Sequence, residues 1–231
     1  ITRIRTSGDR IRSAQRWFTA SIVGSVAFAI VYIPQAISYI VLNGRFGPPN
    51  VITGKMNWLA PHALQVLFSL EHGLFLWTPL LLVASGGLLW LAWSGCGGST
   101  DRIDMRRIGL LLCLMVLTQV YVTGSVDSWT SAGAFGQRRF VGLTVVWVLG
   151  LATLLNVTRA GTRHLLWGVC ALSVWWNLGL IAQFGAGIMD RQRLELVRNA
   201  HGTFIEVPRR LPELAYRYAF DRQSFYAPKT P

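Results

Sequence analysis

The chain has 231 residues, of which 52% are hydrophobic and 14% are charged, whereas a soluble domain carries about 25% charged residues. Its apolar residues form blocks of about 20 residues, the length with which a helix crosses ~30 Å of hydrocarbon, and this pattern excludes an ordinary soluble domain. The net charge of +12 lies almost wholly outside those blocks, where basic residues flank membrane segments, so it argues against nucleic-acid binding.

Five apolar segments predict an all-α polytopic membrane protein with about five transmembrane helices. The predicted spans are residues 17–42, 74–93, 108–126, 140–156 and 165–184. Pro34 removes one backbone hydrogen bond from the first span and predicts a kink there. Residues 1–16 form a basic arm before this transmembrane domain of residues 17–184, and residues 185–231 form a tail after it.

The short loops predict the orientation. Arginines are concentrated in the N-terminal arm, in the loop after the second span and in the loop after the fourth span, which share one side of a five-span protein. By the positive-inside rule this side is the cytoplasm. The sequence therefore predicts a cytoplasmic N-terminus and a C-terminal tail on the outer face.

The first outer loop predicts a short helix that begins at Pro61, since proline suits the first helical position. Four polar residues follow at helical spacing and are expected on one face of that helix, with apolar residues on the others. These polar residues are His62, Gln65, Ser69 and His72. A short amphipathic helix lying in the membrane interface fits this pattern.

Two interpretations of this stripe stay open. Its polar side either faces water, or it lines a headgroup or substrate cleft in which Glu71 or His72 acts as a hydrogen-bonding or acid–base group. The separation of His62 from Glu71 and His72 matches no standard metal motif, so no metal site is predicted.

The second outer loop carries Trp129, Phe135 and the adjacent Arg138 and Arg139, which stand at the mouth of the fourth span. The arginines either extend to phosphate headgroups and anchor the helix, or bind a lipid-linked phosphate through charge-assisted contacts. Trp129 and Phe135 either belong to the interfacial aromatic belt or supply an apolar wall for such a ligand.

Two stretches carry a resemblance to a known family. Residues 69–79, SLEHGLFLWTP, resemble a motif in bacterial polytopic glycosyltransferases related to the dolichyl-phosphate-mannose protein mannosyltransferases, which have the C-type fold. Trp129 together with residues 135–140, FGQRRF, is similar to a second stretch, which also lies on the outer side after a span in those proteins. The order and spacing of the two stretches match those in these glycosyltransferases, and the resemblance covers about residues 55–185.

The resemblance implies transfer of a sugar from a polyprenyl-phosphate carrier at the outer face of the bacterial inner membrane. Arg138 and Arg139 would hold the carrier phosphate, and the stripe from His62 to His72 would line the cleft. The matching stretches belong to the C-terminal half of such proteins, whose catalytic acid lies in the N-terminal half. The chain is therefore expected to be a C-terminal part, and whether it is an enzyme by itself is left open. The lipid-linked sugar is the one cofactor-like molecule implied.

The alternative is a non-catalytic transmembrane subunit that packs against a larger membrane protein complex. The fifth predicted span contains Trp175, Trp176, Asn177 and Gln183, and this partly polar run suits contact with other helices better than contact with lipid. The expected partners are membrane lipids and other membrane chains or a missing N-terminal half.

Overall fold

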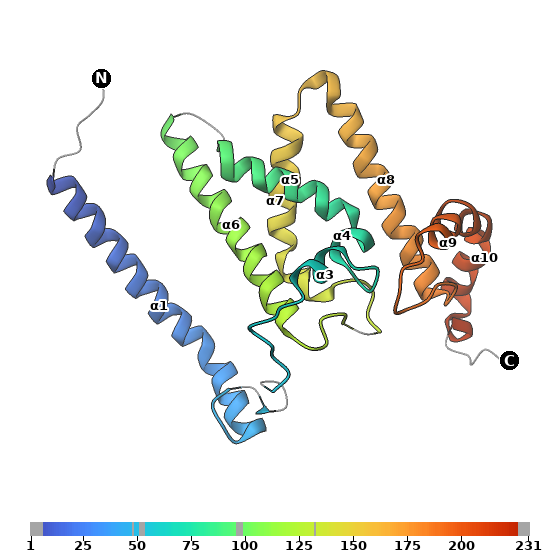
Figure 1. The fold of residues 1–231 in the computed structure, drawn as a ribbon, viewed down its shortest axis with the longest axis horizontal. Helices are drawn as coiled ribbons and strands as arrows, with labels where there is room; N and C mark the ends of the chain where they lie inside the picture. Colours follow the sequence, from blue (N-terminus) through green and yellow to red (C-terminus); the bar gives the residue numbers. More distant parts are fainter. Residues whose placement is uncertain (1–6, 48, 51–53, 96–98, 132, 226–231) are drawn as a thin grey trace. The chain divides into compact units, whose positions relative to one another are not determined.

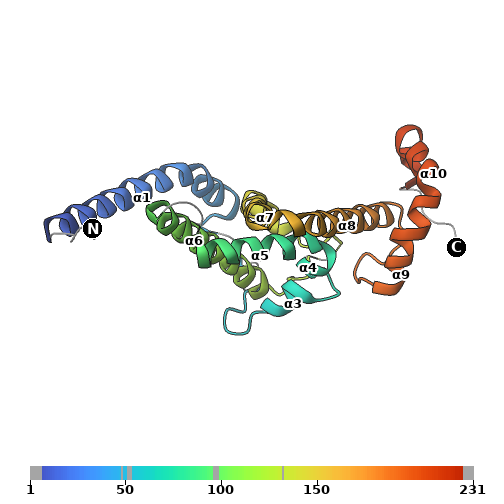
Figure 2. The ribbon, with the colours of Figure 1, turned by 90° about the horizontal axis from the view of Figure 1, so that it is seen from above.

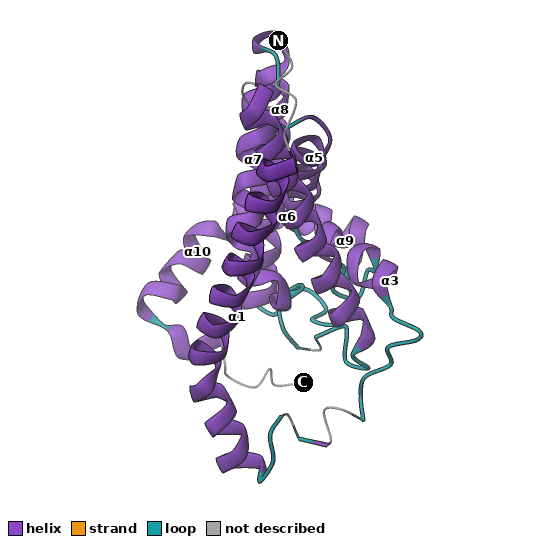
Figure 3. Cartoon of the chain, turned by 90° about the vertical axis from the view of Figure 1, so that its left-hand side faces the viewer, coloured by secondary structure: helices purple, strands orange, loops and turns teal. Residues whose placement is uncertain are grey.

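The computed structural model describes residues 7–47, 49–50, 54–95, 99–131 and 133–225. Within these residues the regular structure is helical, apart from one isolated antiparallel bridge between Met56 and Val126 (Figure 3). The chain divides into two compact units, Ile1–Lys55 and Met56–Pro231, which are described separately.

The first unit is built on α1 (Ser7–Asn43), a helix of 37 residues. Its segment Phe18–Asn43 is long and apolar enough to cross a membrane, with a mean hydropathy of 1.8. Pro34 lies inside α1, and its carbonyl accepts a hydrogen bond of 2.9 Å from the Ser38 hydroxyl. The helix continues past the proline to Asn43, as the predicted first span requires.

The second unit contains three further helical segments that are long and apolar enough to cross a membrane. They are Arg102–Ser125 in α6 (Ser99–Ser125), Arg138–Val157 in η1 (Arg138–Leu143) and α7 (Thr144–Val157), and Ala160–Gly185, which is α8. Together with α1 they make four candidate spans in the described part of the chain, so the protein is a polytopic membrane protein by helix length and composition.

The predicted span 74–93 is divided in the structure. A single turn, α4 (Leu74–Trp77), ends at Thr78, and α5 (Pro79–Ser94) starts with proline at its first position. Pro79 has no N–H to donate to the preceding turn, so the two helices separate at this point. With 16 residues α5 measures about 24 Å, which is shorter than the ~30 Å hydrocarbon layer.

The helices α5 and α7 pack at a close crossing made by glycines. A Cβ atom added to Gly87 in α5 would collide with the carbonyl oxygen of Gly150 in α7, and one added to Gly150 would collide with the carbonyl oxygen of Ala84. On the other side of α5, a Cβ on Gly109 of α6 would meet the backbone of Ala92. Small residues therefore let the three helices approach backbone to backbone, as in many membrane helix pairs.

The connections of the second unit lie at two opposite ends (Figure 1). The C-terminal end of α5, the N-terminal end of α6 and the α7–α8 connection lie at one end. The other end holds α3 (Ala63–Phe68), α4 and the α6–η1 segment. The two arginine-rich loops of this unit that were predicted to share a side therefore lie at the same end.

The helix predicted to follow Pro61 is shorter than expected, and its polar stripe is not continuous. Helix α3 has six residues and ends where Ser69 adopts extended backbone angles. The Ser69 hydroxyl then accepts a hydrogen bond from the Glu71 backbone, and His72 has a left-handed φ of 65°. This local turn competes with the helix, so Ser69 and His72 lie beyond it and do not share a face with His62.

The tail folds against the end of α8. Its elements are α9 (Leu196–His201), a single π turn η2 (Gly202–Glu206), α10 (Val207–Phe220) and η3 (Arg222–Phe225). The buried amide of Gln183 in α8 donates to the Asn199 carbonyl at 3.1 Å and to the Thr203 hydroxyl at 2.9 Å, and accepts from the Asn199 amide at 3.2 Å. This satisfied polar network fixes the start of the tail to the span.

Candidate functional site

The two segments that were predicted to form functional outer loops meet in the structure. The rings of His62, at the start of α3, and Trp129 stack with centroids 5.6 Å apart. The Gln137 amide donates to the Trp129 carbonyl at 2.9 Å, which holds the α6–η1 segment in place. Trp129 therefore has a defined position beside α3, and His62 is its partner.

A second aromatic cluster, formed by His72, Trp77, Phe135 and Phe184, lies between these segments and α8. His72 is fully buried, and its ring stacks on Trp77 with centroids 4.8 Å apart and an angle of 8°. Phe135 meets Trp77 edge-on at 5.3 Å and Phe184 edge-on at 5.5 Å. The Trp77 indole donates to the Leu70 carbonyl at 3.2 Å, so a polar contact also fixes the cluster.

Burial lowers the pKa of His72 below its ordinary value, because the apolar surroundings disfavour the charged ring. The backbone groups of Arg191 and Ala134 act in the opposite direction, as do the charges of Glu71 and Asp190, but burial is the larger effect. Neither ring nitrogen meets the geometry of a hydrogen bond to any residue that the structure describes. His72 therefore has no exposed surface for a substrate, whereas Glu71 is exposed.

The adjacent arginines of η1 have different environments. Arg138 is exposed, whereas Arg139 is half-buried and its guanidinium donates to the Ser128 hydroxyl at 3.2 Å. The Arg139 carbonyl accepts from the Gln119 amide of α6 at 3.0 Å, and a second guanidinium nitrogen is buried without a partner among the described residues. Arg139 is thus fixed by contacts with Gln119 and Ser128, whereas Arg138 is exposed.

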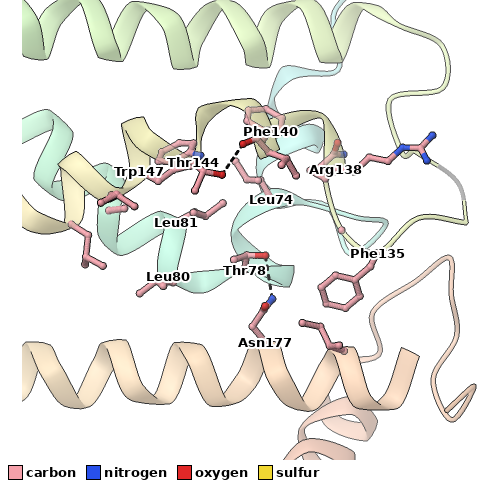
Figure 4. A pocket seen from close by; sticks show the side chains of 17 residues that line it. Leu74, Thr78, Leu80, Leu81, Phe135, Arg138, Phe140, Thr144, Trp147 and Asn177 are labelled. Atoms are coloured by element: carbon pink, nitrogen blue, oxygen red, sulfur yellow. Dashed lines mark hydrogen bonds between the residues drawn. The ribbon is translucent and has the colours of Figure 1, made fainter. Parts of the chain in front are cut away.

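A cavity of about 390 Å³ lies between α4 and α5 on one side, η1 and α7 on a second and α8 on a third (Figure 4). Most of its lining is apolar, from Leu74, Leu80, Leu81, Ala84, Phe135, Phe140, Val141, Trp147, Val148, Leu151 and Ile181. Its other lining residues are Gly136 and the polar Thr78, Gln137, Arg138, Thr144 and Asn177. Of the two arginines only Arg138 lines it, and its guanidinium points out of the loop end of the cavity (Figure 4).

The polar wall of the cavity forms where α4 breaks from α5. The Asn177 amide of α8 donates to the Trp77 carbonyl at 3.0 Å and to the Thr78 hydroxyl at 3.3 Å, and the Trp176 indole donates to the Leu76 carbonyl at 3.1 Å. These carbonyls lose their helical donors at the break, and the side chains of α8 replace them. The polar run in the last span therefore has partners within this chain.

The structure brings some of the predicted site residues together and separates others. Arg138 and Phe135 line the cavity, and His72 contacts it indirectly through Trp77 and Phe135. The remaining candidates do not line it; these are His62, Glu71, Trp129 and Arg139.

Four polar residues of the cavity wall were not predicted as site residues: Thr78, Gln137, Thr144 and Asn177. An asparagine within an apolar span was the available signal for one of them. Within the described residues, no group of three His, Cys, Asp or Glu side chains has metal-binding proximity.

Comparison of the chain with protein-family models, with curated proteins and with solved structures finds no match in any of the three.

Proposed function

We propose that this chain binds a polyprenyl-phosphate lipid in the cavity between α5, α7 and α8, as the C-terminal part of a membrane glycosyltransferase that takes its sugar from that carrier. The observation that carries the proposal is the cavity itself, which is apolar along the helices and has Arg138 at its loop end. The resemblance of residues 69–79 and 135–140 to lipid-linked-sugar glycosyltransferases supports the same class of ligand.

The shape and chemistry of the cavity match the two parts of such a lipid. A prenyl chain is apolar and gains free energy when it leaves water for a wall of leucine, valine and aromatic side chains. A phosphate needs charge-assisted donors, and the Arg138 guanidinium points beyond the loop end of the cavity, where the headgroup of a bound chain would emerge. Arg138 is exposed, so it can contact that phosphate without losing an internal ion pair.

Binding of undecaprenyl phosphate to the purified full chain, measured by native mass spectrometry in mild detergent, tests the proposal. Arg138→Gln removes the cation from the cavity mouth and is expected to weaken binding about 10-fold or more, since a hydrogen bond to a charged group is worth ~1.5–3 kcal/mol. Arg163→Gln is the matched control, because Arg163 is also exposed but belongs to the first turn of α8, which starts at the opposite end of the unit (Figure 1). Equal affinities for the two variants would contradict the assignment of Arg138.

The apolar part of the site has its own test on α7. Val148 lines the cavity and Val145 does not, although both valines are exposed. Val148→Trp fills part of the cavity and is expected to reduce binding of undecaprenyl phosphate, whereas Val145→Trp leaves it unchanged. If both tryptophan variants bind the lipid as the unsubstituted chain does, the prenyl chain does not occupy this cavity.

A non-catalytic subunit of a larger membrane complex is the second candidate function. It is favoured by an apolar stripe on α8, where Leu165, Leu172, Trp175 and Leu178 are exposed at helical spacing. Such a stripe suits either lipid or another membrane helix. Purification in mild detergent distinguishes the candidates: a stoichiometric membrane partner without bound polyprenyl phosphate favours the subunit, and bound lipid favours the glycosyltransferase part.

A further inference from the structure

Helix α10 carries an apolar stripe that is only partly covered by the protein. Val207, Leu211, Leu214 and Tyr218 recur at intervals of four, three and four residues, which places them on one face of the helix. Val207 is 5% exposed, whereas Leu211 is 54% exposed and Tyr218 is 63% exposed. The stripe therefore begins in packed contact, Leu214 is half-buried, and Leu211 and Tyr218 stay exposed among the described residues.

The position of α10 indicates what can cover the rest of the stripe. The helix follows η2, whose Thr203 is bound by the Gln183 amide two residues before α8 ends at Gly185. Helix α10 itself packs against α8, and Figures 1 and 2 show it beside the end of that helix. Because α8 is a candidate membrane span, α10 starts beside the C-terminal turns of a helix that is long and apolar enough to cross a membrane.

Basic residues accompany the stripe. Arg209, Arg210 and Arg217 outnumber the single acid of the helix, Glu213. The Arg222 guanidinium, just after the helix, lies 4.4 Å from the centre of the Tyr218 ring. An apolar face with arginines beside it is typical of helices that lie in the membrane interface and bind anionic headgroups.

We propose that α10 lies in the headgroup layer of an anionic bilayer, with Leu211, Leu214 and Tyr218 directed into its apolar side and the arginines bound to lipid phosphates. This assigns the tail a membrane-binding surface of its own. The inference rests on α8 and on the tail alone, so it holds or fails independently of the lipid in the cavity.

A depth measurement on the full chain in vesicles tests this placement. The native cysteines Cys96, Cys113 and Cys170 are replaced by alanine, and an environment-sensitive fluorophore is attached to Leu211→Cys or to Tyr216→Cys. Tyr216 is the matched control, since it is also exposed but lies on another side of the helix by the helical period. In vesicles of phosphatidylcholine and phosphatidylglycerol, spin-labelled lipid should quench the label at 211 strongly, and aqueous iodide should quench the label at 216.

The charge requirement has a separate measurement. Arg210→Gln combined with Arg217→Gln should lower the lipid-quenched fraction at position 211 several-fold in vesicles with phosphatidylglycerol, and should change it little in phosphatidylcholine alone. Hydrogen exchange of the unsubstituted chain provides a readout without cysteine replacement: amides of α10 should exchange more slowly in the anionic vesicles than in detergent.

Two results would overturn the proposal. Equal iodide quenching at positions 211 and 216 would show that the stripe faces water. Protection of position 211 without quenching by spin-labelled lipid would show that a protein surface covers it.

Discussion

At the scale of single residues, His72 is a fully buried titratable side chain that follows the exposed Glu71. Its ring stacks on Trp77 in a cluster with Phe135, and burial lowers its pKa. Because the folded state disfavours the imidazolium, the unfolded chain binds a proton at a higher pH than the folded chain does. The free energy of unfolding should therefore fall as the pH drops below the ordinary histidine pKa of about 6.5, and should level off below the lowered pKa.

His72→Phe keeps an aromatic ring on Trp77 and removes this titration. We expect the melting temperature of the variant in mild detergent to depend less on pH than that of the unsubstituted chain between about pH 7.5 and pH 5. His164→Phe is the control, since His164 is exposed and contacts solvent in the folded chain. If the melting temperatures of His72→Phe and of the unsubstituted chain change with pH in parallel, titration of the buried His72 does not contribute to the pH dependence of stability.

The side chain of Asn177 replaces a backbone hydrogen bond that is lost at the break between α4 and α5. Asn177→Leu leaves the Trp77 carbonyl without this donor, and we expect it to lower the free energy of unfolding by about 1–3 kcal/mol. Ser173→Ala is the control on the same helix, since the Ser173 hydroxyl donates only to the Val169 carbonyl one turn before it. Denaturant titration in detergent compares the two, and a loss no larger for Asn177→Leu than for Ser173→Ala would exclude a special role for the amide.

At the scale of helices, the crossing of α5 and α7 depends on the absence of side-chain atoms. Gly150→Ala places a methyl group against the Ala84 carbonyl, so the two helices must move apart. A Cβ atom added to Gly168 in α8 meets no atom within 4 Å. Gly168→Ala should therefore be neutral or stabilising by up to ~1 kcal/mol, because alanine is the better helix former. We therefore expect opposite changes in melting temperature, with a loss for Gly150→Ala. The same sign for both variants would show that the crossing is not tightly packed.

Hydropathy predicted four of the five spans as helices of sufficient length, because blocks of apolar residues are a direct consequence of bilayer thickness. It overestimated the length of the continuous helix in the second predicted span, because Pro79 starts a new helix after the separate turn α4. Helical periodicity also extended α3 through Ser69 to His72. Periodicity reports spacing alone, and it does not reveal a hydroxyl that bonds the backbone or a residue with positive φ.

The candidate site was predictable only in part, for a different physical reason. Arg138 and Phe135 stand close together in sequence, in the segment that leads into the candidate span Arg138–Val157. Thr78 and Asn177 are far apart in the chain and meet through the packing of α8 on α4 and α5. No local pattern encodes such a contact, so the polar wall of the cavity emerged only from the structure.

At the scale of the second unit, the arrangement of connections makes a prediction about membrane topology. The segment around Asp127 lies at the end that also holds α3, and Thr162 lies at the start of α8, at the opposite end (Figure 1). A single cysteine at either position tests this in a variant without native cysteines, since both side chains are exposed. In intact spheroplasts, a membrane-impermeant maleimide should label Asp127→Cys and should label Thr162→Cys only after the membrane is permeabilised.

The membrane topology of the unit depends on whether α5 crosses the bilayer. This helix is shorter than the hydrocarbon layer is thick. Its ends lie toward opposite ends of the unit (Figure 1), so a residue before it and a residue after it should lie on opposite sides of the membrane. Leu59 precedes it and is 98% exposed, and Arg106 follows it and is exposed. Labelling of Leu59→Cys but not of Arg106→Cys in spheroplasts would mean that α5 crosses, with the bilayer thinned around it or its ends in the headgroups. Labelling of both would mean that α5 enters and returns on one side, and that the unit crosses the membrane only with α6, α7 and α8.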